Sequence, residues 1–450
     1  MKHAARDLTQ GRLAGQIMVF SLPLMFSNLL QVLFNMSDVA VVGRFAGAAA
    51  LGAVGSTTTM VSLFTSFLIG LGSGVNVLTA RYFGARQGRE LEQVVHTGAL
   101  LCLALGLVIL ALGQSFARPL LELLGTKPEL IEGAALYLRL YFLGMPALAL
   151  YNFGNGVLSA VGDTRRPLIY LSIAGVLNVA LNLFFVIVCG MDVDGVAIAS
   201  FISQYVSAVL ILRALFRSRE GYGLRWSALR PDWRTARQLT GIGIPSGFQH
   251  AIFAVANLFI QAGVNSLDTV VVEANSAAAN ADSVVYTVMD AFYTACASFI
   301  GQNYGAGKRD RMKRSYFLAL AYSSGTGLLL GLGLVVFGRQ FLSLFTTESA
   351  VIEAGMSRLT IMGFSFWLAP FMDNTTAACR GLGKSLVPTV IVILGSCVFR
   401  VIWIYTVFAH FGTITSLYLL YIFSWAITAA AEIVYFIRCF RRLPEMQPID

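Results

Sequence analysis

Long apolar stretches separated by short polar segments recur along the whole chain. Twelve can be distinguished, each of roughly twenty residues or more, which is the length that crosses a bilayer as a helix. The ten-residue alternating segments of a membrane β-barrel, roughly half as long, are not seen. The pattern predicts an all-α polytopic membrane protein with spans at 13–38, 46–78, 94–117, 134–156, 168–189, 194–215, 239–266, 274–300, 315–338, 353–379, 387–408 and 414–437.

Charge is scarce in this chain of 450 residues. Only 12% of the residues are charged, 57% are hydrophobic and the mean hydropathy is +0.72. Because a soluble domain carries about 25% charged residues, these values exclude a water-soluble enzyme and a disordered chain. They also make nucleic-acid binding a poor explanation of the net charge of +9. We expect the lipid bilayer and a small molecule as partners.

The basic residues are distributed unevenly over the predicted loops. Of 32 lysines and arginines, 25 fall in the N-terminal segment, in every second loop and in the C-terminal tail. The positive-inside rule places these segments in the cytoplasm. An even number of spans also requires both ends on one side. We therefore predict a multi-pass protein of the cytoplasmic membrane with both termini cytoplasmic.

The two halves of the chain resemble each other at a shift of about 221 residues. Pro23 then falls within one residue of Pro245, and GDTRRP at 162–167 falls on GKSLVP at 383–388. Two halves inserted in the same direction form a parallel repeat, an architecture of secondary transporters. We predict a first six-helix lobe, a basic cytoplasmic linker and a second six-helix lobe with the tail, at residues 1–212, 213–238 and 239–450.

Short motifs in both halves resemble one known family. They are MSDVAVVGR at 36–44, ARYFGAR at 80–86, LSAVGDTRRP at 158–167, LNVALNLFFV at 177–186, QNYGAGK at 302–308 and RGLGKSLVP at 380–388. This set resembles the multidrug and toxic compound extrusion (MATE) family. Within the family it is most similar to the bacterial branch that includes staphylococcal drug exporters and DNA-damage-inducible members. The resemblance implies twelve helices in two six-helix lobes around a central cleft, and drug export coupled to a cation.

Four polar residues share one face of the first predicted helix, because they recur at steps of three and four. They are Asn28, Gln31, Asn35 and Asp38. An ionisable residue at membrane depth is a functional candidate, since burying its charge costs several kcal/mol. One interpretation is a hydrated pocket in which Asp38 binds a proton or Na⁺. The other is a set of interhelical hydrogen bonds that hold the lobe together.

The resemblance favours the first interpretation, because Asp38 matches the aspartate of the family's first helix. Asn178 and Asn182 lie one turn apart on the fifth span, Tyr137 matches a family tyrosine that faces the same pocket, and Ser200 is a further candidate ligand for Na⁺. Related members often carry an aspartate where this chain has Asn182. That departure removes one charge from the implied cation site, which puts Na⁺ coupling in doubt and leaves protons as an alternative.

The second half carries a different set of polar residues. Asp282 and Asp290 lie on nearly one face of the eighth span, with Tyr286 between them. Further candidates for substrate binding or coupling are His250, Asn257 and Asp373. A histidine in such a position is more often a hydrogen-bonded structural residue than a proton carrier. The family's glutamate on the seventh span is absent from this sequence.

Arg400 lies near the middle of the eleventh span, where an unpaired charge is costly. At a rise of about 1.5 Å per residue, Asp290 is its nearest acid by depth and Asp373 the second. We expect an ion pair that braces the lobe. The alternative is a pair whose carboxylate is also bound by the substrate or a proton.

Three classes of function fit a chain of this kind to different degrees. The leading hypothesis is a monomeric H⁺- or Na⁺-coupled antiporter that exports amphipathic, cationic drugs by alternating access, with Pro23 and Pro245 as bending points. The alternative is a flippase for lipids or lipid-linked oligosaccharides. Its anionic substrate would require several basic residues in the cavity, whereas mid-span acids outnumber Arg400 here. A membrane enzyme is not expected, because no nucleophile, metal-binding or nucleotide-binding motif is present. We expect no cofactor, and we expect the six cysteines to be buried apolar residues rather than disulfides or metal ligands.

Overall fold

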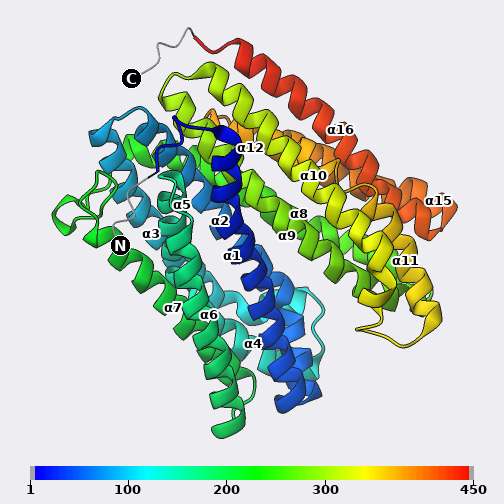
Figure 1. The fold of residues 1–450 in the computed structure, drawn as a ribbon. Coiled ribbons are helices and arrows are strands. Elements are labelled where there is room, and N and C mark those ends of the chain that lie inside the picture. The colour runs from blue at the N-terminus through cyan, green and yellow to red at the C-terminus, as the bar shows by residue number, and fades with distance from the viewer. Residues whose placement is uncertain (1–5, 445–450) are drawn as a thin grey trace. The chain divides into compact units, whose positions relative to one another are not determined.

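A computed structural model describes residues 6–444, and within that range it contains helices and loops but no β-strand. Each predicted apolar stretch falls on helical structure, which confirms the all-α fold (Figure 1). The helices of the first half are α1 (Leu13–Val41), α2 (Ala48–Gly84), α3 (Gly88–Leu123), α4 (Pro128–Phe142), α5 (Met145–Ala160), α6 (Arg165–Leu183) and α7 (Val193–Arg217). Those of the second half are α8 (Trp233–Asn265), α9 (Thr269–Gly305), α10 (Arg309–Leu342), α11 (Ser349–Gly363), α12 (Ala369–Gly381), α13 (Leu386–Val392), α14 (Phe399–Trp403), α15 (Ala409–Phe411) and α16 (Ile414–Arg441).

Short π-helical segments interrupt or extend three of these helical runs. They are η1 (Val42–Ala46) after α1, η2 (Phe184–Val188) after α6, and η4 (Ile393–Val398) and η5 (Ile404–Phe408) on either side of α14. A short 3₁₀ helix, η3 (Trp226–Ala228), lies in the central linker. Single π turns inside α-helices occur frequently at functional sites.

Within the described residues, ten helices are long and apolar enough to cross a membrane, and eleven if α4 and α5 form one bent span. That pair bends by 45° at its break. The remaining predicted span, 353–379, corresponds to α11 and α12, which are separate helices. Helix α12 is too short and too polar to meet the same criterion, because it carries Asp373, Asn374 and Arg380.

By packing, the chain divides into two compact units. Of the described residues, unit 1 comprises 6–7 and 26–251, and unit 2 comprises 8–25 and 252–444. Helices α1 and α8 therefore each begin in one unit and end in the other. The predicted lobes have no such exchange, so the two divisions differ at residues 8–25 and at the first part of α8. Both helices continue without a break through Pro23 and Pro245.

Glycines allow close helix packing inside each unit. In unit 1, a Cβ on Gly156 would lie 2.6 Å from the carbonyl oxygen of Gly72, so α2 and α5 approach closely there. The Asn76 amide reinforces this contact by donating to the Gly156 carbonyl at 3.1 Å. In unit 2, a Cβ on Gly331 would lie 2.1 Å from the Gly363 carbonyl oxygen, between α10 and α11. Small residues at such contacts are typical of membrane helix pairs.

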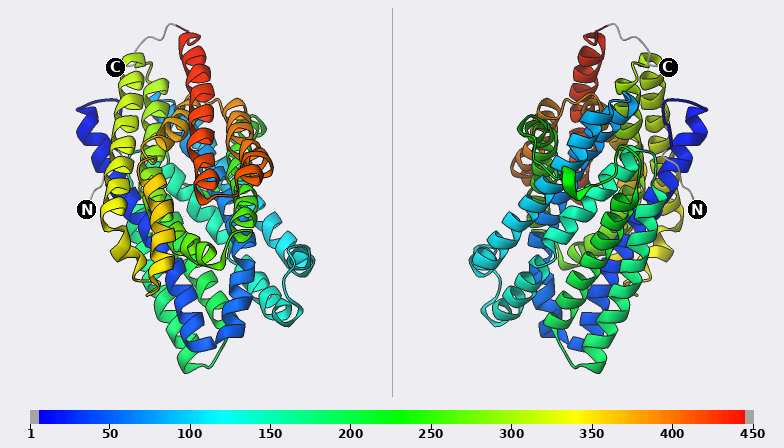
Figure 2. Two further views of the ribbon diagram at one scale, coloured as in Figure 1. Left: turned by 90° about the vertical axis from the view of Figure 1, so that its right-hand side faces the viewer. Right: turned by 90° about the vertical axis from the view of Figure 1, so that its left-hand side faces the viewer.

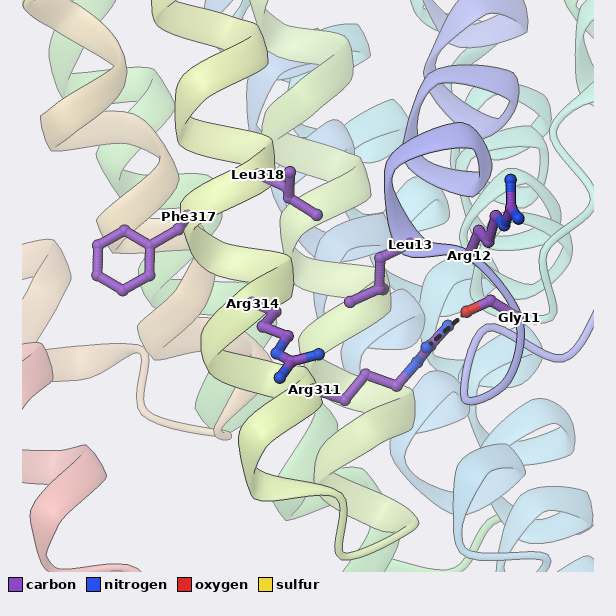
Figure 3. Close-up of a pocket in the computed structure, with 7 residues that line it drawn as sticks. All are labelled: Gly11, Arg12, Leu13, Arg311, Arg314, Phe317 and Leu318. Carbon is purple, nitrogen blue, oxygen red and sulfur yellow. Dashed lines mark hydrogen bonds between the residues drawn. The ribbon is translucent and has the colours of Figure 1, made fainter.

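The segment before α1 is fastened to α10 within unit 2. The Arg311 guanidinium donates to the carbonyl oxygens of Leu8 and Gly11, the latter at 2.8 Å (Figure 3). A cavity of about 500 Å³ lies beside this contact, and Arg12 and Arg314 contribute to its lining.

Figure 2 shows α16 in red beside the orange segment that contains α13 to α15. This segment carries Arg400.

The linker is packed against α3 within unit 1. The backbone N–H of Arg225 donates to Nε2 of His96 at 2.9 Å, and the N–H of Asp232 donates to Thr97 Oγ1 at 3.1 Å. His96 is 1% exposed. Asp232 also caps α8, since its carboxylate accepts the Thr235 N–H at 2.7 Å. These hydrogen bonds with Thr235 lower the pKa of the Asp232 carboxyl.

Candidate functional site

Asp38 lies on α1 in unit 1, where two other helices, α6 and α7, place polar side chains around it. Asn182 on α6 donates from Nδ2 to one carboxylate oxygen, and Ser200 on α7 donates to the other at 3.3 Å. Asn178, one turn before Asn182, donates to Ser200 Oγ at 3.4 Å and accepts from Asn182 at 3.3 Å. The structure thus brings together Asp38, Asn178, Asn182 and Ser200, which we call the Asp38 site.

Local structure explains how α1 comes within reach of α6. A Cβ on Gly175 would lie 1.7 Å from the Phe34 ring, so the two helices approach at a position that accepts no larger side chain. The π segments η1 and η2 begin four residues after Asp38 and two residues after Asn182. These turns depart from regular α-helical hydrogen bonding next to the site on both helices.

One acceptor of the site has no partner. Asn182 is fully buried, and its Oδ1 accepts no hydrogen bond within residues 6–444. An unsatisfied buried acceptor costs about 1–3 kcal/mol, so a bound proton donor or cation would be stabilised there. Together with the Asp38 carboxylate, the side-chain oxygens of Asn178 and Ser200 complete a set of oxygen donors. Such a set of oxygen donors can hold a proton or a hard cation.

The other residues predicted near Asp38 lie in different surroundings. Tyr137 on α4 is 5% exposed and stacks on Tyr141 at 5.9 Å between ring centroids. It is close enough to interact electrostatically with Asp38, but it forms no hydrogen bond to it in the described structure. Gln31 is half-buried and Asn35 exposed, and neither is hydrogen-bonded to the Asp38 carboxylate within the described part of the chain. Asn28, on the same face of α1, is half-buried.

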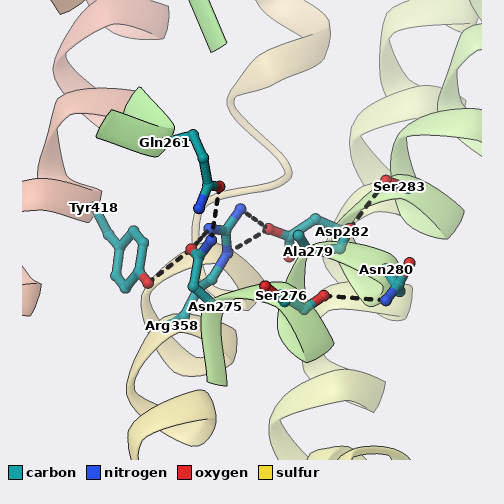
Figure 4. A network of polar contacts seen from close by, with 9 residues as sticks. All are labelled: Gln261, Asn275, Ser276, Ala279, Asn280, Asp282, Ser283, Arg358 and Tyr418. Carbon is teal, nitrogen blue, oxygen red and sulfur yellow. Dashed lines mark hydrogen bonds and ion pairs between the residues drawn. The ribbon is translucent and has the colours of Figure 1, made fainter. Parts of the chain in front are cut away.

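Unit 2 contains a buried ion pair that the sequence analysis did not predict. The Arg358 guanidinium on α11 donates twice to Asp282 Oδ2 on α9, at 2.9 and 2.7 Å, and once to Asn275 Oδ1 (Figure 4). Tyr418 on α16 also donates to Asn275 Oδ1, at 3.0 Å, and its ring lies 4.9 Å from the guanidinium carbon. Arg358 is 7% exposed and Asp282 5%. Asp282 is therefore held in an ion pair.

The prediction that Arg400 forms an ion pair with Asp290 or Asp373 is wrong. No carboxylate within residues 6–444 comes within 4.0 Å of its guanidinium, neither that of Asp290 nor that of Asp373. The side chain turns instead to α16, where Nε donates to Ser424 at 3.1 Å. The physical reason is the flanking pair η4 and η5, because a π turn does not keep the constant α-helical rise on which the depth estimate depended.

The remaining candidates are spread over both units. His250 is half-buried in the part of α8 that belongs to unit 1, whereas Asn257 is exposed in the part that belongs to unit 2. Tyr286 contacts the rings of Phe366 and Trp425 edge-on. Asp373 is half-buried on α12, and Asp290 is exposed on α9.

Glu432 is a buried acid that the sequence analysis missed. It is 0% exposed on α16, and its Oε2 lies 4.0 Å from Cys379 Sγ. Its sequence signal was an isolated acid within the last apolar stretch.

All six cysteines are free, and Cys102, Cys296, Cys379 and Cys397 are buried.

Several known transport and resistance proteins are similar to this chain over most of its length. Probable multidrug resistance protein YpnP of Bacillus subtilis is 30% identical over 363 residues, 80% of this chain and 81% of that protein. Multidrug export protein MepA of Staphylococcus aureus is 22% identical over 427 residues, which cover 94% and 93% of the two chains. A MOP superfamily transporter from Pyrococcus furiosus shares the fold, with a TM-score of 0.91, 23% identity and coverage of 98% and 99%.

The MatE family pattern matches the chain twice, at residues 23–184 and again at 245–406. The two matches are displaced by 222 residues at both ends, which confirms the internal repeat predicted from the sequence. Together they include more than half of the chain, and the first copy contains Asp38, Asn178 and Asn182 of the Asp38 site. The chain belongs to the MatE family, the multidrug and toxic compound extrusion transporters.

Proposed function

We propose that this transporter is an antiporter of the cytoplasmic membrane that exports amphipathic, cationic drugs in exchange for H⁺ or Na⁺. The observation that carries the proposal is the Asp38 site, in which one carboxylate meets amide and hydroxyl groups and one buried amide oxygen is unpartnered. The relatives named as multidrug resistance and export proteins support drugs as the substrate class.

Coupling follows from what a cation does to the hydrogen bonds of Asp38. The ionised carboxylate accepts from Asn182 and Ser200 and so ties α1 to α6 and α7. A proton or Na⁺ on the carboxylate competes with these donors and weakens that attachment. The cation therefore stabilises one arrangement of α1 over another, which is the differential affinity that alternating access requires. With Asn182 in place of a second acid, the site carries one formal charge and takes one monovalent cation per cycle.

Ethidium efflux from proteoliposomes containing the purified monomer tests this proposal. Either an imposed proton gradient or an imposed sodium gradient should drive efflux in the wild type, and Asp38→Asn should abolish the response to it. Asp192→Asn is the matched control, since Asp192 is an exposed acid in the loop before α7 and should leave coupling unchanged. The proposal would be contradicted if the efflux rate of the wild type did not depend on either gradient. It would also be contradicted if gradient-driven efflux persisted in Asp38→Asn.

A flippase for lipids or lipid-linked oligosaccharides is the alternative function. It predicts that no dye is exported under either gradient, and that a fluorescent anionic lipid is transferred between leaflets of the same proteoliposomes.

A further inference from the structure

Arg400 is a buried cation without a counterion in contact. Its side chain is 4% exposed, its guanidinium carbon lies 4.7 Å from the Tyr421 ring and 5.7 Å from the Phe253 ring, and only Nε donates a hydrogen bond. Across residues 6–444, its terminal nitrogens have no hydrogen-bond partner and no carboxylate within 4.0 Å. Buried charges are normally paired, so an unpaired guanidinium in a membrane helix is stabilised by a ligand of opposite charge.

The internal repeat identifies the counterpart of Arg400 in the first half. Before η4 the halves align at a shift of 221, as Pro167 and Pro388 show. After η4 the shift is 222, because the family matches end at residues 184 and 406. A π turn holds one residue more than an α turn, so η4 accounts for the change. Arg400 follows η4 and therefore corresponds to Asn178 of the Asp38 site.

The neighbours of Arg400 on α16 also have counterparts in the first half, at a shift of 221 residues. Helices α7 and α16 begin at Val193 and Ile414, a shift that pairs Ser200 with Tyr421. In unit 1 Asn178 is bonded to Ser200, and in unit 2 Arg400 stacks on Tyr421. Two independent contacts thus occupy equivalent positions, which supports the alignment.

The two corresponding positions suit ligands of opposite charge. Along α1 and α8 the shift is 222, as Pro23 and Pro245 show, so Asp38 corresponds to Ile260. The first repeat therefore has an acid supported by amides, whereas the second has no acid at that position and a guanidinium in place of an amide. The first arrangement suits a cation and the second suits an anion.

The segment that carries Arg400 is held firmly against α16. A Cβ on Gly395 of η4 would lie 2.4 Å from Thr428 Oγ1, and Ser396 is hydrogen-bonded to Thr428 at 3.0 Å. Ser424, one turn earlier on α16, fixes Nε of Arg400. With Nε bound and one face on Tyr421, the two terminal nitrogens are the part of the guanidinium left for a ligand.

We propose that Arg400 and Tyr421 form an anion-binding subsite in unit 2 that takes the carboxylate of a zwitterionic substrate. The proposal rests on the proposed export function and specifies amphipathic substrates that carry a carboxylate in addition to their cationic group. A single guanidinium matches one carboxylate in a bidentate geometry. Asp290 and Asp373 lie in the same unit, and Arg400 and Asp290 both act electrostatically on Asp373. Their charges disfavour a phosphate dianion and favour a ligand whose ammonium group accompanies its carboxylate.

The test compares tetramethylrhodamine, which carries a free carboxylate, with its methyl ester, which does not. Binding of each dye to the purified full-length protein is measured by fluorescence anisotropy, and export of each is measured in proteoliposomes. The wild type should prefer the acid. In Arg400→Gln the ratio of ester Kd to acid Kd should fall by about tenfold or more, the loss expected for a charge-assisted bidentate contact.

Two further variants keep the result interpretable. Arg400→Lys keeps the charge but loses the planar fork, so its ratio should lie between those of the wild type and Arg400→Gln. Arg339→Gln is the matched control, because Arg339 is an exposed arginine paired with Glu353 and should leave the ratio unchanged. Thermal unfolding of each variant shows that the folded protein is being compared.

The outcomes separate this inference from the proposed function. If the wild type exports neither dye, the export function itself fails. If it exports both dyes and Arg400→Gln leaves the ratio unchanged, the subsite is wrong while export stands. A ratio that falls in Arg400→Gln but not in Arg339→Gln supports the subsite.

Discussion

Replacing Arg358 by methionine should destabilise unit 2 more than replacing Asp282 by asparagine. The two residues form one ion pair, but their other contacts are unequal. Asp282 accepts hydrogen bonds from Arg358 alone, and its Oδ1 has no partner within the described structure. Arg358 also donates to Asn275 and lies over the Tyr418 ring.

The magnitudes follow from what each change leaves behind. Arg358→Met leaves a carboxylate that is 5% exposed without any counterion, a loss of about 3–5 kcal/mol for a broken buried pair. Asp282→Asn keeps an acceptor oxygen for Arg358, which retains Asn275 and Tyr418, so the loss should be about 1–2 kcal/mol. The double variant Asp282→Leu/Arg358→Met removes both charges and should be more stable than Arg358→Met alone.

Unfolding of the purified protein in mixed detergent micelles, followed by circular dichroism, measures these differences. The wild type, Asp282→Leu, Arg358→Met and the double variant Asp282→Leu/Arg358→Met form a mutant cycle from which the coupling energy is obtained, and Asp282→Asn is measured beside them. Equal losses in the two single variants, or a double variant less stable than Arg358→Met, would refute the reasoning. Ethidium efflux under the same gradients shows whether the pair also affects transport.

Three further predictions concern unit 1. Gly175→Ala should displace the Phe34 ring and destabilise the α1–α6 contact by about 1–3 kcal/mol, measured by thermal unfolding with Gly55→Ala, where a Cβ meets no neighbour, as control. Asn182→Asp should place a second carboxylate in the Asp38 site and raise the apparent affinity for the coupling cation by about tenfold or more, measured as the cation dependence of efflux. Asp232→Ala should loosen the start of α8 at neutral pH. Because hydrogen bonds with Thr235 lower the pKa of the Asp232 carboxyl, this cap contributes above about pH 4 and is lost on further acidification. Hydrogen exchange of α8 should therefore differ between wild type and variant at pH 7 and converge near pH 3, and an equal difference at both values would contradict the cap.

Apolar stretch length was sufficient to locate the helices, because a segment of bilayer length leaves few alternatives to a helix. It did not predict the interruptions. The break between α11 and α12 lies at residues 364–368, directly before Pro370 in the first turn of α12, where a proline begins a helix but does not continue one. The exchange of the first parts of α1 and α8 between the units depends on which surfaces pack together. Periodicity along one helix carries no information about that choice.

The Asp38 site could be predicted because Asp38 matches a family motif, and because Asn178 and Asn182 lie one turn apart on one helix. The Arg358 network could not, since Arg358, Asn275 and Tyr418 lie on three helices far apart in sequence. The polar groups of Asn275 and Tyr418 satisfy Arg358 only after those helices have packed. An arginine inside an apolar stretch was the available signal, but its partner is selected by tertiary geometry.

Arg400 shows why a repeat cannot be compared at one constant shift. At a shift of 221 its counterpart is Val179, a residue with no polar group, and the relation to the Asp38 site is lost. One added residue in η4 rotates the following helix by about 100°, since an α-helix has 3.6 residues per turn. Such a rotation turns the side chain at position 400 toward Ser424 and Tyr421 of α16, where it makes its contacts. The added residue acts together with two differences in residue type, Arg400 at the position of Asn178 and Ile260 at the position of Asp38, so that the second copy presents a guanidinium where the first presents an acid and amides. Because duplicated halves begin with identical sequences, a π turn combined with such substitutions gives a simple physical route by which the second half acquires a contact for a carboxylate that the first half lacks.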